Sequence, residues 1–246
     1  MKITIITVVY NAEMYIEDCI QSVINQSHQD IEYIVIDGQS TDGTLREIDA
    51  YSNQITHFLS EKDCGLYDAI NKGIKLATGD VVGLLNADDM LVQDDIISFV
   101  ARAFADHPAI DAVYGNLNYI HASTREVARR WVSKQADHRD MEKGWMPAHP
   151  TLYIRRALFE KYGHYALDLG TAADYDLMLR YFCGYQLKAL HLPVLMVNMR
   201  MGGVSNRNVS SLWYAIINDY KALKRNKIAN AWLVLIRKKL SKLSQF

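Results

Sequence analysis

The sequence predicts an α/β fold: a mostly parallel sheet flanked by helices on both faces. Short apolar, β-branched runs alternate with segments of helical periodicity through the first half of the chain. Half of the 246 residues are hydrophobic, which is enough for a well-filled core. Strands that alternate with helices run parallel and are covered on both faces, so the pattern favours this architecture.

The first half supplies the regular part of the pattern. We expect strands at residues 3–10, 31–36, 56–59 and 81–85, each rich in Val, Ile or Leu. Helices are expected at 15–25, 44–51, 67–77 and 96–104. In the first of these helices, Ile16, Ile20, Val23 and Ile24 recur at helical spacing.

The second half is less regular. We expect paired strands at 112–121 and 125–132, further strands at 151–154 and 194–199, and helices at 156–162 and 174–182. Two amphipathic helices, 212–224 and 229–243, are expected to close the chain. The sequence shows no internal repeat or long linker, so we predict one domain over residues 1–225 and a basic helical tail over 226–246.

Composition excludes several classes of protein. The net charge is −1, which does not indicate a nucleic-acid binder. Three widely separated cysteines indicate reduced thiols and a cytoplasmic location. The first apolar run is too short for a signal peptide, and no stretch approaches the roughly 20 apolar residues that span a bilayer.

Polar residues follow each of the first four predicted strands. They are Tyr10-Asn11, Asp37-Gly38-Gln39-Ser40, Glu61-Lys62-Asp63 and Asn86-Ala87-Asp88-Asp89. Parallel strands end at the same edge of a sheet, and ligands bind beyond that edge. The four clusters therefore predict one cleft.

Two of these clusters suggest specific chemistry. Asp88 and Asp89 suit a hard divalent cation, although Asp88 could instead cap a helix while Asp89 is solvated. Asp37 is placed to hydrogen-bond a nucleoside, although DGQSTDG is also a plain turn sequence. No strand is followed by GxGxxG or GxxxxGK[ST], which argues against a dinucleotide-dependent dehydrogenase or a P-loop enzyme.

Three segments carry a family resemblance: TVVYNAEMYIEDCIQSVINQS, EYIVIDGQSTDGT and SEKDCGLYDAINKGIKLATGDVVGLLNADD. Together they resemble the inverting family 2 glycosyltransferases, which have the Rossmann-like GT-A fold. Farther along, MPAHPTLYIRRALFEKYG and TAADYDLMLRYF resemble the acceptor half of bacterial members that build surface polysaccharides. The resemblance implies a nucleotide-sugar half at 1–115 and an acceptor half at 116–225.

The resemblance also implies a nucleotide-sugar donor, with a UDP-sugar favoured, and Mg²⁺ or Mn²⁺. The positions that match donor contacts are Tyr10, Asp37 and Ser40 for the base and ribose, and Asp63 and Lys72 in a segment that closes over the nucleotide, with Asp68 secondary. Asn86-Ala87-Asp88 occupies the family's Asp-x-Asp motif. Asn86 departs from that motif and supplies no charge. Asp88 matches the metal-binding position, and Asp89 replaces it if the register is one residue off.

The resemblance points to Asp174 as the catalytic base. Many relatives carry Glu-Asp there, whereas this chain has Ala173 before Asp174. Asp176 is a poor rival because it lies about 200° around the helix. Alternatively, Asp174 only places charge at a helix N-terminus. His149 is either an acceptor or diphosphate contact or a plain loop residue, and residues 200–205 resemble a loop that covers the diphosphate.

The implied activity is transfer of a sugar to a hydroxyl of a glycan or lipid-linked acceptor, with inversion at the anomeric carbon. A non-catalytic sugar-nucleotide or glycan binding protein derived from a transferase is the alternative. The departures at Asn86 and Ala173 favour that alternative, and the retained Asp88 and Asp174 oppose it. Turnover of donor with and without acceptor separates the two.

The tail has its own pattern. Apolar residues recur on one helical face at Ala229, Trp232, Leu233, Ile236, Leu240 and Leu243, beside several lysines and arginines. One interpretation is peripheral binding to the anionic inner face of a membrane. The other is that the apolar face packs on the catalytic domain or on a second copy of the chain in a homo-oligomer.

Overall fold

The parallel half of the sheet forms as expected. The computed structural model describes the backbone of residues 1–202 and 209–243 and the side chains of 1–202 and 213–238. Its first four strands are β1 (Ile3–Val9), β2 (Ile31–Asp37), β3 (His57–Ser60) and β4 (Val81–Leu84). They lie in the order β3-β2-β1-β4 and are all parallel. The register pairs Val9 with Asp37 and Asp37 with Ser60, so the polar strand ends are neighbours.

The second half extends the same sheet with mixed pairings. Its strands are β5 (Met90–Leu91), β6 (Ala112–Ile120), β7 (Val127–Trp131), β8 (Tyr153–Arg155) and β9 (Ala189–Arg200). The path continues as β4-β8-β6-β9-β5, with β7 on β6, and only β6 and β9 pair in parallel. One nine-stranded sheet therefore runs through both halves, and the predicted division into a domain and a tail remains a prediction.

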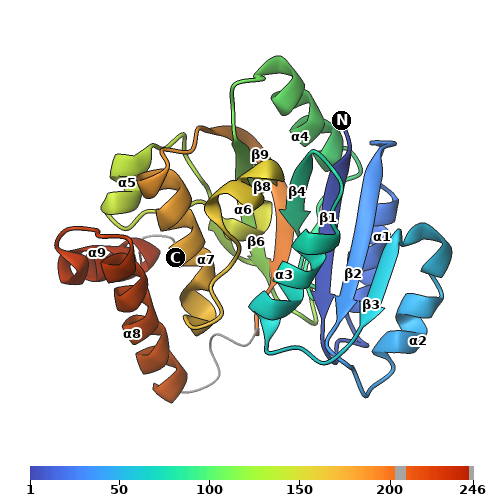
Figure 1. Cartoon of the computed structure of the whole chain (residues 1–246). Coiled ribbons are helices and arrows are strands. Elements are labelled where there is room, and N and C mark those ends of the chain that lie inside the picture. Colours follow the sequence, from blue (N-terminus) through green and yellow to red (C-terminus); the bar gives the residue numbers. More distant parts are fainter. Residues whose placement is uncertain (203–208, 244–246) are drawn as a thin grey trace.

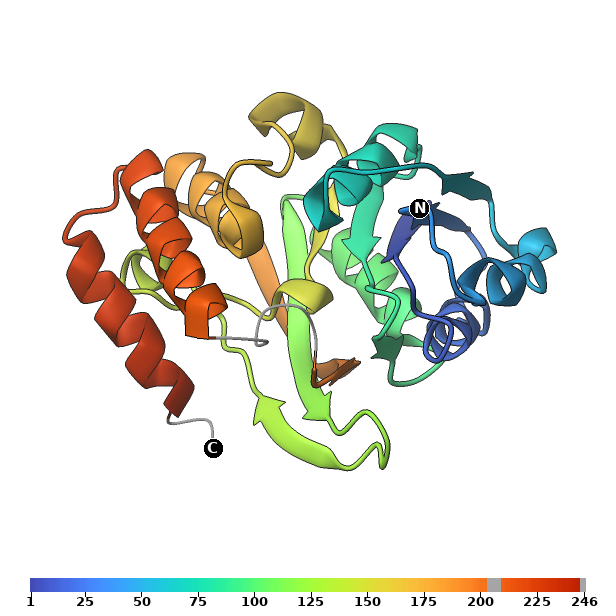
Figure 2. The ribbon, with the colours of Figure 1, turned by 90° about the horizontal axis from the view of Figure 1, so that it is seen from below.

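Helices cover the parallel strands on both faces. α3 (Leu66–Leu76) packs on β1 and β2, whereas α1 (Ile16–Ile24) and α4 (Ile96–Asp106) lie on the opposite face (Figures 1 and 2). The short α2 (Thr44–Asp49) contacts α1. α1 buries Ile16, Cys19, Ile20 and Val23, a stripe that matches the predicted periodicity. The predicted α/β architecture is confirmed.

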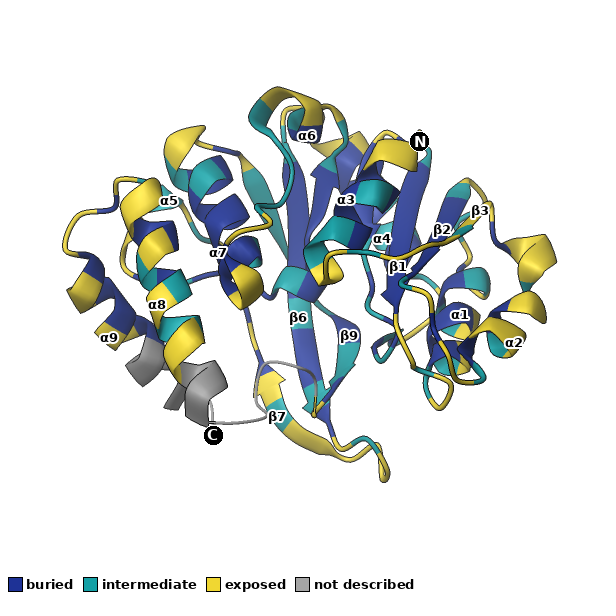
Figure 3. Ribbon diagram, turned by 60° about the horizontal axis from the view of Figure 1, so that its bottom comes forward, coloured by how far each residue is buried: buried dark blue, intermediate teal, exposed yellow. Residues whose placement is uncertain are grey.

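The remaining helices gather beside the mixed part of the sheet. They are α5 (His138–Glu142), α6 (Ala157–Tyr162), α7 (Ala173–Met178), α8 (Val209–Arg225) and α9 (Ala231–Leu243). A π-helical stretch over Leu179–Gly184 continues α7. α7 packs on α8, α8 packs on α9, and exposed residues line the outer sides of the last two helices (Figure 3). Among the described residues no helix is both long and apolar enough to cross a membrane.

Candidate active site

The loops after β1 and β2 are tied together by side chains. Asn11 has a positive φ of 49°, its backbone N–H donates to Ser40 Oγ at 2.9 Å, and its Oδ1 accepts from the Thr41 backbone at 2.8 Å. Asn tolerates this left-handed conformation better than most residues do. The Ala12 backbone donates to Thr44 Oγ1 at 2.8 Å. One edge of the predicted cleft is therefore preorganised.

Tyr10 and Asp63 meet at Gly38. A Cβ atom at Gly38 would lie 2.5 Å from Asp63 Oδ2 and 3.5 Å from Tyr10 Cδ2, so only glycine fits between them. The Tyr10 side chain is 64% exposed, and Asp63 is half-buried. An open aromatic ring beside a carboxylate acceptor can stack a flat base and accept a hydrogen bond from it. The structure thus brings together two of the predicted donor contacts.

Asp37 and Ser40 are hydrogen-bonded to each other. Asp37 is fully buried, and its carboxylate accepts hydrogen bonds from the backbone N–H and the hydroxyl of Ser40 and from Ser60 Oγ. In this conformation Asp37 shapes the loop that presents Tyr10 and Gly38. A direct contact from Asp37 or Ser40 to ribose stays a prediction.

Lys72 ties the segment between β3 and α3. Its Nζ lies 2.9 Å from Glu61 Oε1 and 3.6 Å from Asp68 Oδ2, and it donates to the Lys62 carbonyl at 2.9 Å. Asp68 also accepts from the Cys64 backbone N–H at 3.0 Å. Both residues therefore hold the segment that the sequence assigned to closing over the nucleotide. Contact of Lys72 with the donor stays a prediction.

Asp88 and Asp89 have different surroundings. Asp89 is fully buried, and it accepts from Asn86 Nδ2 and from the Arg200 backbone N–H, both at 3.2 Å. Asp88 is half-buried, and its carboxylate accepts no hydrogen bond from another residue among the contacts described. Burial raises the pKa of both carboxyls, and the charge of Asp88 raises that of Asp89 further. Asp88 is the open member of the pair.

These surroundings favour Asp88 over Asp89 as the predicted metal ligand, which stays a prediction. Asp89 is a poor candidate because its oxygens are buried and already hydrogen-bonded. No group of three or more His, Cys, Asp or Glu side chains among the described residues is placed to hold a metal ion. One open carboxylate still fits Mg²⁺ or Mn²⁺ with a phosphorylated ligand, since phosphates and water commonly complete the shell.

The sequence analysis placed Arg200 in the predicted covering loop, residues 200–205, but did not predict its contacts with the donor-side acids. This residue, at the end of β9, is only 3% exposed. Its guanidinium pairs with Asp18, donates to the Asp88 carbonyl at 2.8 Å, and lies 4.9 Å from the centre of the Tyr15 ring. The one available signal was an arginine at the end of an apolar strand. Of the predicted covering loop, residues 203–205 lie outside the described residues.

Asp174 and His149 meet on the acceptor side. Asp174 lies in the first turn of α7, and its Oδ1 accepts from the Tyr175 backbone N–H at 2.7 Å. Its Oδ2 is 3.3 Å from His149 Nδ1, in the short 3₁₀ turn His149–Thr151. Both side chains are partly exposed. The structure therefore pairs the predicted base with the predicted acceptor or diphosphate contact.

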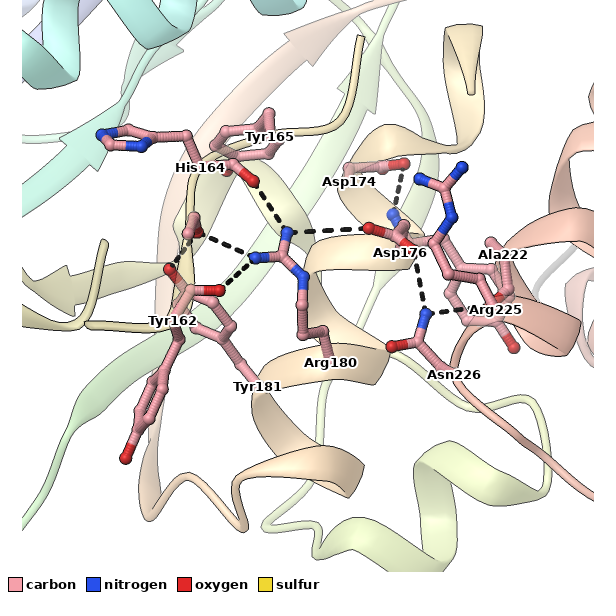
Figure 4. Close-up of polar contacts among 12 residues, drawn as sticks. Tyr162, His164, Tyr165, Asp174, Asp176, Arg180, Tyr181, Ala222, Arg225 and Asn226 are labelled. Carbon is pink, nitrogen blue, oxygen red and sulfur yellow. Dashed lines mark hydrogen bonds and ion pairs between the residues drawn. The ribbon is translucent and has the colours of Figure 1, made fainter. Parts of the chain in front are cut away.

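Asp176, the rival base, is buried. Its carboxylate accepts from Asn226 Nδ2 at 2.9 Å and lies 3.6 Å from Arg180 Nη2 (Figure 4). Arg180 also donates to the carbonyls of Tyr162, Gly163 and His164. Asp176 thus anchors α7 to neighbouring segments and is not accessible to an acceptor hydroxyl.

Two tyrosines, also missed by the sequence analysis, connect the halves. Burial, and then the charge of Asp174, raise the pKa of Tyr67 on α3, whose ring stacks on Tyr165 at 5.5 Å. Burial also raises the pKa of Tyr119 on β6; the charge of Arg129 lowers it, and the charges of Asp89 and Asp174 raise it further. Tyr119 is therefore within electrostatic range of both acidic clusters, and at neutral pH both hydroxyls remain hydrogen-bond donors.

Comparisons with known proteins agree with this arrangement. The sequence profile described as Glycosyl transferase family 2 matches residues 4–163. A PGL/p-HBAD biosynthesis glycosyltransferase of Mycobacterium tuberculosis is 31% identical over 207 residues, which is 82% of this chain and 78% of that protein. The chondroitin synthase of Escherichia coli is 27% identical over 70% of this chain but only 25% of its own length.

Solved structures match in fold. S. aureus TarS 1–349 in complex with UDP-GlcNAc superposes with a TM-score of 0.72 at 19% identity, covering 97% of this chain and 71% of that one. The mannosyltransferase PcManGT from Pyrobaculum calidifontis, in complex with GDP-Man and Mn²⁺, gives 0.66 at 20% identity, covering 96% and 68%. The expected GT-A fold is confirmed.

Proposed function

Because the chain belongs to glycosyltransferase family 2, we propose that it is a metal-dependent inverting transferase that uses a nucleoside-diphosphate sugar. The acceptor is a hydroxyl of a glycan or lipid-linked sugar in surface polysaccharide or glycolipid synthesis. The mycobacterial relative named for glycolipid biosynthesis supports this acceptor class. A lipid-linked acceptor would place the enzyme in the cytoplasm at the inner face of a membrane.

One observation carries the proposal. Each half of the molecule offers one partly exposed carboxylate, Asp88 after β4 and Asp174 at the start of α7. Tyr119 is within electrostatic range of Asp174 and of Asp89, the neighbour of Asp88. Transfer from a diphosphate donor to a hydroxyl needs a group that holds a cation beside the leaving group and a group that accepts the proton of the nucleophile.

The donor contacts that the family resemblance implies are supported by the same geometry. Tyr10 stacks the base and Asp63 accepts a hydrogen bond from it, while Asp37 and Ser40 hold the loop that carries Gly38. A UDP-sugar is favoured, in line with the UDP-GlcNAc complex of TarS, although PcManGT binds GDP-Man. Asn86 keeps the Asp88–Asp89 turn in shape, since its carbonyl accepts the Asp89 backbone N–H at 3.0 Å.

Mg²⁺ or Mn²⁺ bound through Asp88 would neutralise charge on the departing nucleoside diphosphate. Asp174 accepts the proton from the acceptor hydroxyl as the hydroxyl oxygen attacks the anomeric carbon from the face opposite the diphosphate. The bond from that carbon to the diphosphate breaks in the same displacement, so the configuration inverts. His149, 3.3 Å from Asp174, restricts the carboxylate to one orientation.

A donor panel tests the proposal. Released nucleoside diphosphate would be measured with UDP- and GDP-sugars, with and without a glycan or lipid-linked acceptor, and with Mg²⁺, Mn²⁺ or EDTA. We expect acceptor-dependent release that EDTA abolishes, and a product of inverted configuration by anomeric NMR. Donor binding without turnover under any of these conditions would instead support the non-catalytic alternative.

A further inference from the structure

The C-terminal helix pair exposes an apolar surface that the catalytic cleft does not use. It consists of Trp213, Tyr214 and Ile217 on α8 and Trp232, Leu233 and Ile236 on α9, and we call it the C-terminal apolar face. Trp213, Tyr214 and Trp232 are each more than 60% exposed. Trp213 and Trp232 are the two tryptophans that are exposed in the described chain. Such a concentration on two adjacent helices indicates a contact surface.

The two stripes form one continuous surface. The ring of Tyr220 on α8 stacks on Trp232 of α9, with ring centroids 4.6 Å apart. Residues 213, 217 and 220 are three or four apart, and 236 is four from 232 and three from 233, so each set follows one side of its helix. The two helices lie side by side (Figures 2 and 3), and the Tyr220–Trp232 stacking brings the two sides together.

The opposite face of α9 is already packed. Ala231, Val234 and Leu235 are buried, whereas Trp232, Leu233 and Ile236 are exposed. Lys238 Nζ lies 3.0 Å from Asp219 Oδ2 and 3.4 Å from the centre of the Tyr175 ring on α7. The expectation that the stripe containing Trp232, Leu233 and Ile236 packs on the catalytic domain is therefore wrong for these residues. Of that predicted stripe, Leu240 and Leu243 lie outside the described side chains.

The charged residues of the chain after Asp219 are all of one sign. The sequence has eight lysines and arginines after Asp219 and no aspartate or glutamate, which leaves 19 basic and 28 acidic residues in 1–220. Lys221, Lys224, Lys227 and Arg237 are exposed on the helix pair and its connecting turn. An anionic plane would attract this end of the molecule and repel the rest, which also sets an orientation.

We propose that the C-terminal apolar face docks on an anionic lipid surface, with its tryptophans in the headgroup region and its basic residues on the lipid charges. Exposed Trp and Ile beside lysines and arginines are the composition of interfacial helices. A symmetric dimer through the same face would bring the two basic rims together, so the charge pattern disfavours a second copy as the occupant. The proposal goes beyond the transfer reaction and does not depend on it.

Vesicle binding tests this surface without any substrate. The full chain would be sedimented with phosphatidylcholine vesicles that contain or lack phosphatidylglycerol, over a range of NaCl concentrations. We expect binding only to the anionic vesicles, weakening as salt rises. The triple variant K221Q/K224Q/R237Q should lower the partition coefficient about a hundredfold, given the usual contribution of each basic group. W232S/I236S should lower it at least tenfold by removing inserted apolar area.

Matched controls use exposed residues elsewhere. L45S/F58S removes two exposed apolar side chains from the other end of the sheet, and K75Q/R102Q/K188Q removes three exposed cations outside the tail. Both should bind vesicles like the wild type, and thermal unfolding checks that every variant folds. Absence of wild-type binding at low salt, or equal losses in the control variants, overturns the proposal. So does dimerisation that W232S/I236S abolishes without any vesicle binding.

Discussion

The two halves of the molecule each place two acidic side chains close together, and the pairs are built differently. In the donor half, Asp88 is open while Asp89 is buried beside a like charge, and the nearby Arg200 guanidinium only partly offsets the effect of burial on the two carboxyl pKa values. In the acceptor half, Asp174 is open while Asp176 is buried against Arg180 and Asn226. In the acceptor half the buried acid has a direct ionic partner in Arg180, whereas in the donor half the guanidinium of Arg200 makes its ion pair with Asp18. The donor pair has raised pKa values and gains most from an added cation.

The largest expected effect is at Asp88. Asp88→Ala should abolish transfer, and Asp88→Asn should lower kcat/KM by about 10³-fold, because each removes the open charge that a cation would use. Nucleoside diphosphate release measured with added Mg²⁺ or Mn²⁺ checks this. Asp94→Asn, which changes an exposed acid six residues farther along the chain, is the matched control and should behave like the wild type. Full activity of Asp88→Asn in metal-free buffer would remove Asp88 from the metal site.

Asp174→Asn should bind donor nearly normally and lose kcat by about 10²-fold or more, the usual scale for a lost general base. Donor affinity by calorimetry and single-turnover rates separate binding from chemistry. If Asp174→Asn kept wild-type kcat while Asp176→Asn lost it, Asp176 would be the base. That result would contradict the assignment of Asp174 as the open acid and Asp176 as the structural one.

The fold was largely predictable, because apolar periodicity reports directly on which faces are buried. The four parallel strands and the helices between them needed only that signal. Only residues 194–199 of β9 were predicted, because residues 189–193 contain His191 and Pro193 and lack a clear alternation of apolar and polar side chains. The short β5 is also too brief for any periodic signal.

Most residues of the site were predictable, but which of them are exposed to a ligand and which are buried as structural residues was not. Tyr10, Asp63, Asp88, Asp174 and His149 were proposed from motif positions, and the structure brings Tyr10 to Asp63 and His149 to Asp174. Spacing could not show that Asp37 and Asp89 point inward, since a side chain's partners depend on loops distant in sequence. The contributions of Arg200, Tyr67 and Tyr119 arise from such long-range packing.

The buried acid of the acceptor half should matter for stability. Asp176→Asn should lower the free energy of unfolding by about 2 kcal/mol, because it weakens the Asn226 bond and leaves Arg180 without its carboxylate. Denaturant unfolding measures this. Asp168→Asn is the matched control, since Asp168 pairs with Arg225 at an exposed position and should cost less than about 1 kcal/mol. A larger loss of stability for Asp168→Asn than for Asp176→Asn would contradict the conclusion that the buried Asp176 contributes more than the exposed Asp168.

The smallest expected effect distinguishes Asp89 by its pH dependence. The folded-state pKa of Asp89 is raised by burial and by Asp88, so the folded protein holds this proton more tightly than the unfolded chain does. Its contribution to stability is therefore fully present below the unfolded pKa, about 3.9, and is lost as pH rises through the raised folded pKa.

Asp89→Asn cannot ionise and keeps an oxygen for the Arg200 backbone bond. In metal-free buffer the variant should gain stability relative to the wild type as pH increases from 4 to 8. The gain in the free energy of unfolding should correspond to the shift in the pKa of this one carboxyl between the unfolded and folded states. Paired urea titrations at each pH give that difference in stability directly. A difference for Asp89→Asn that stays constant or falls with pH would mean that Asp89 already has a sufficient counter-charge, as Asp176 has in Arg180.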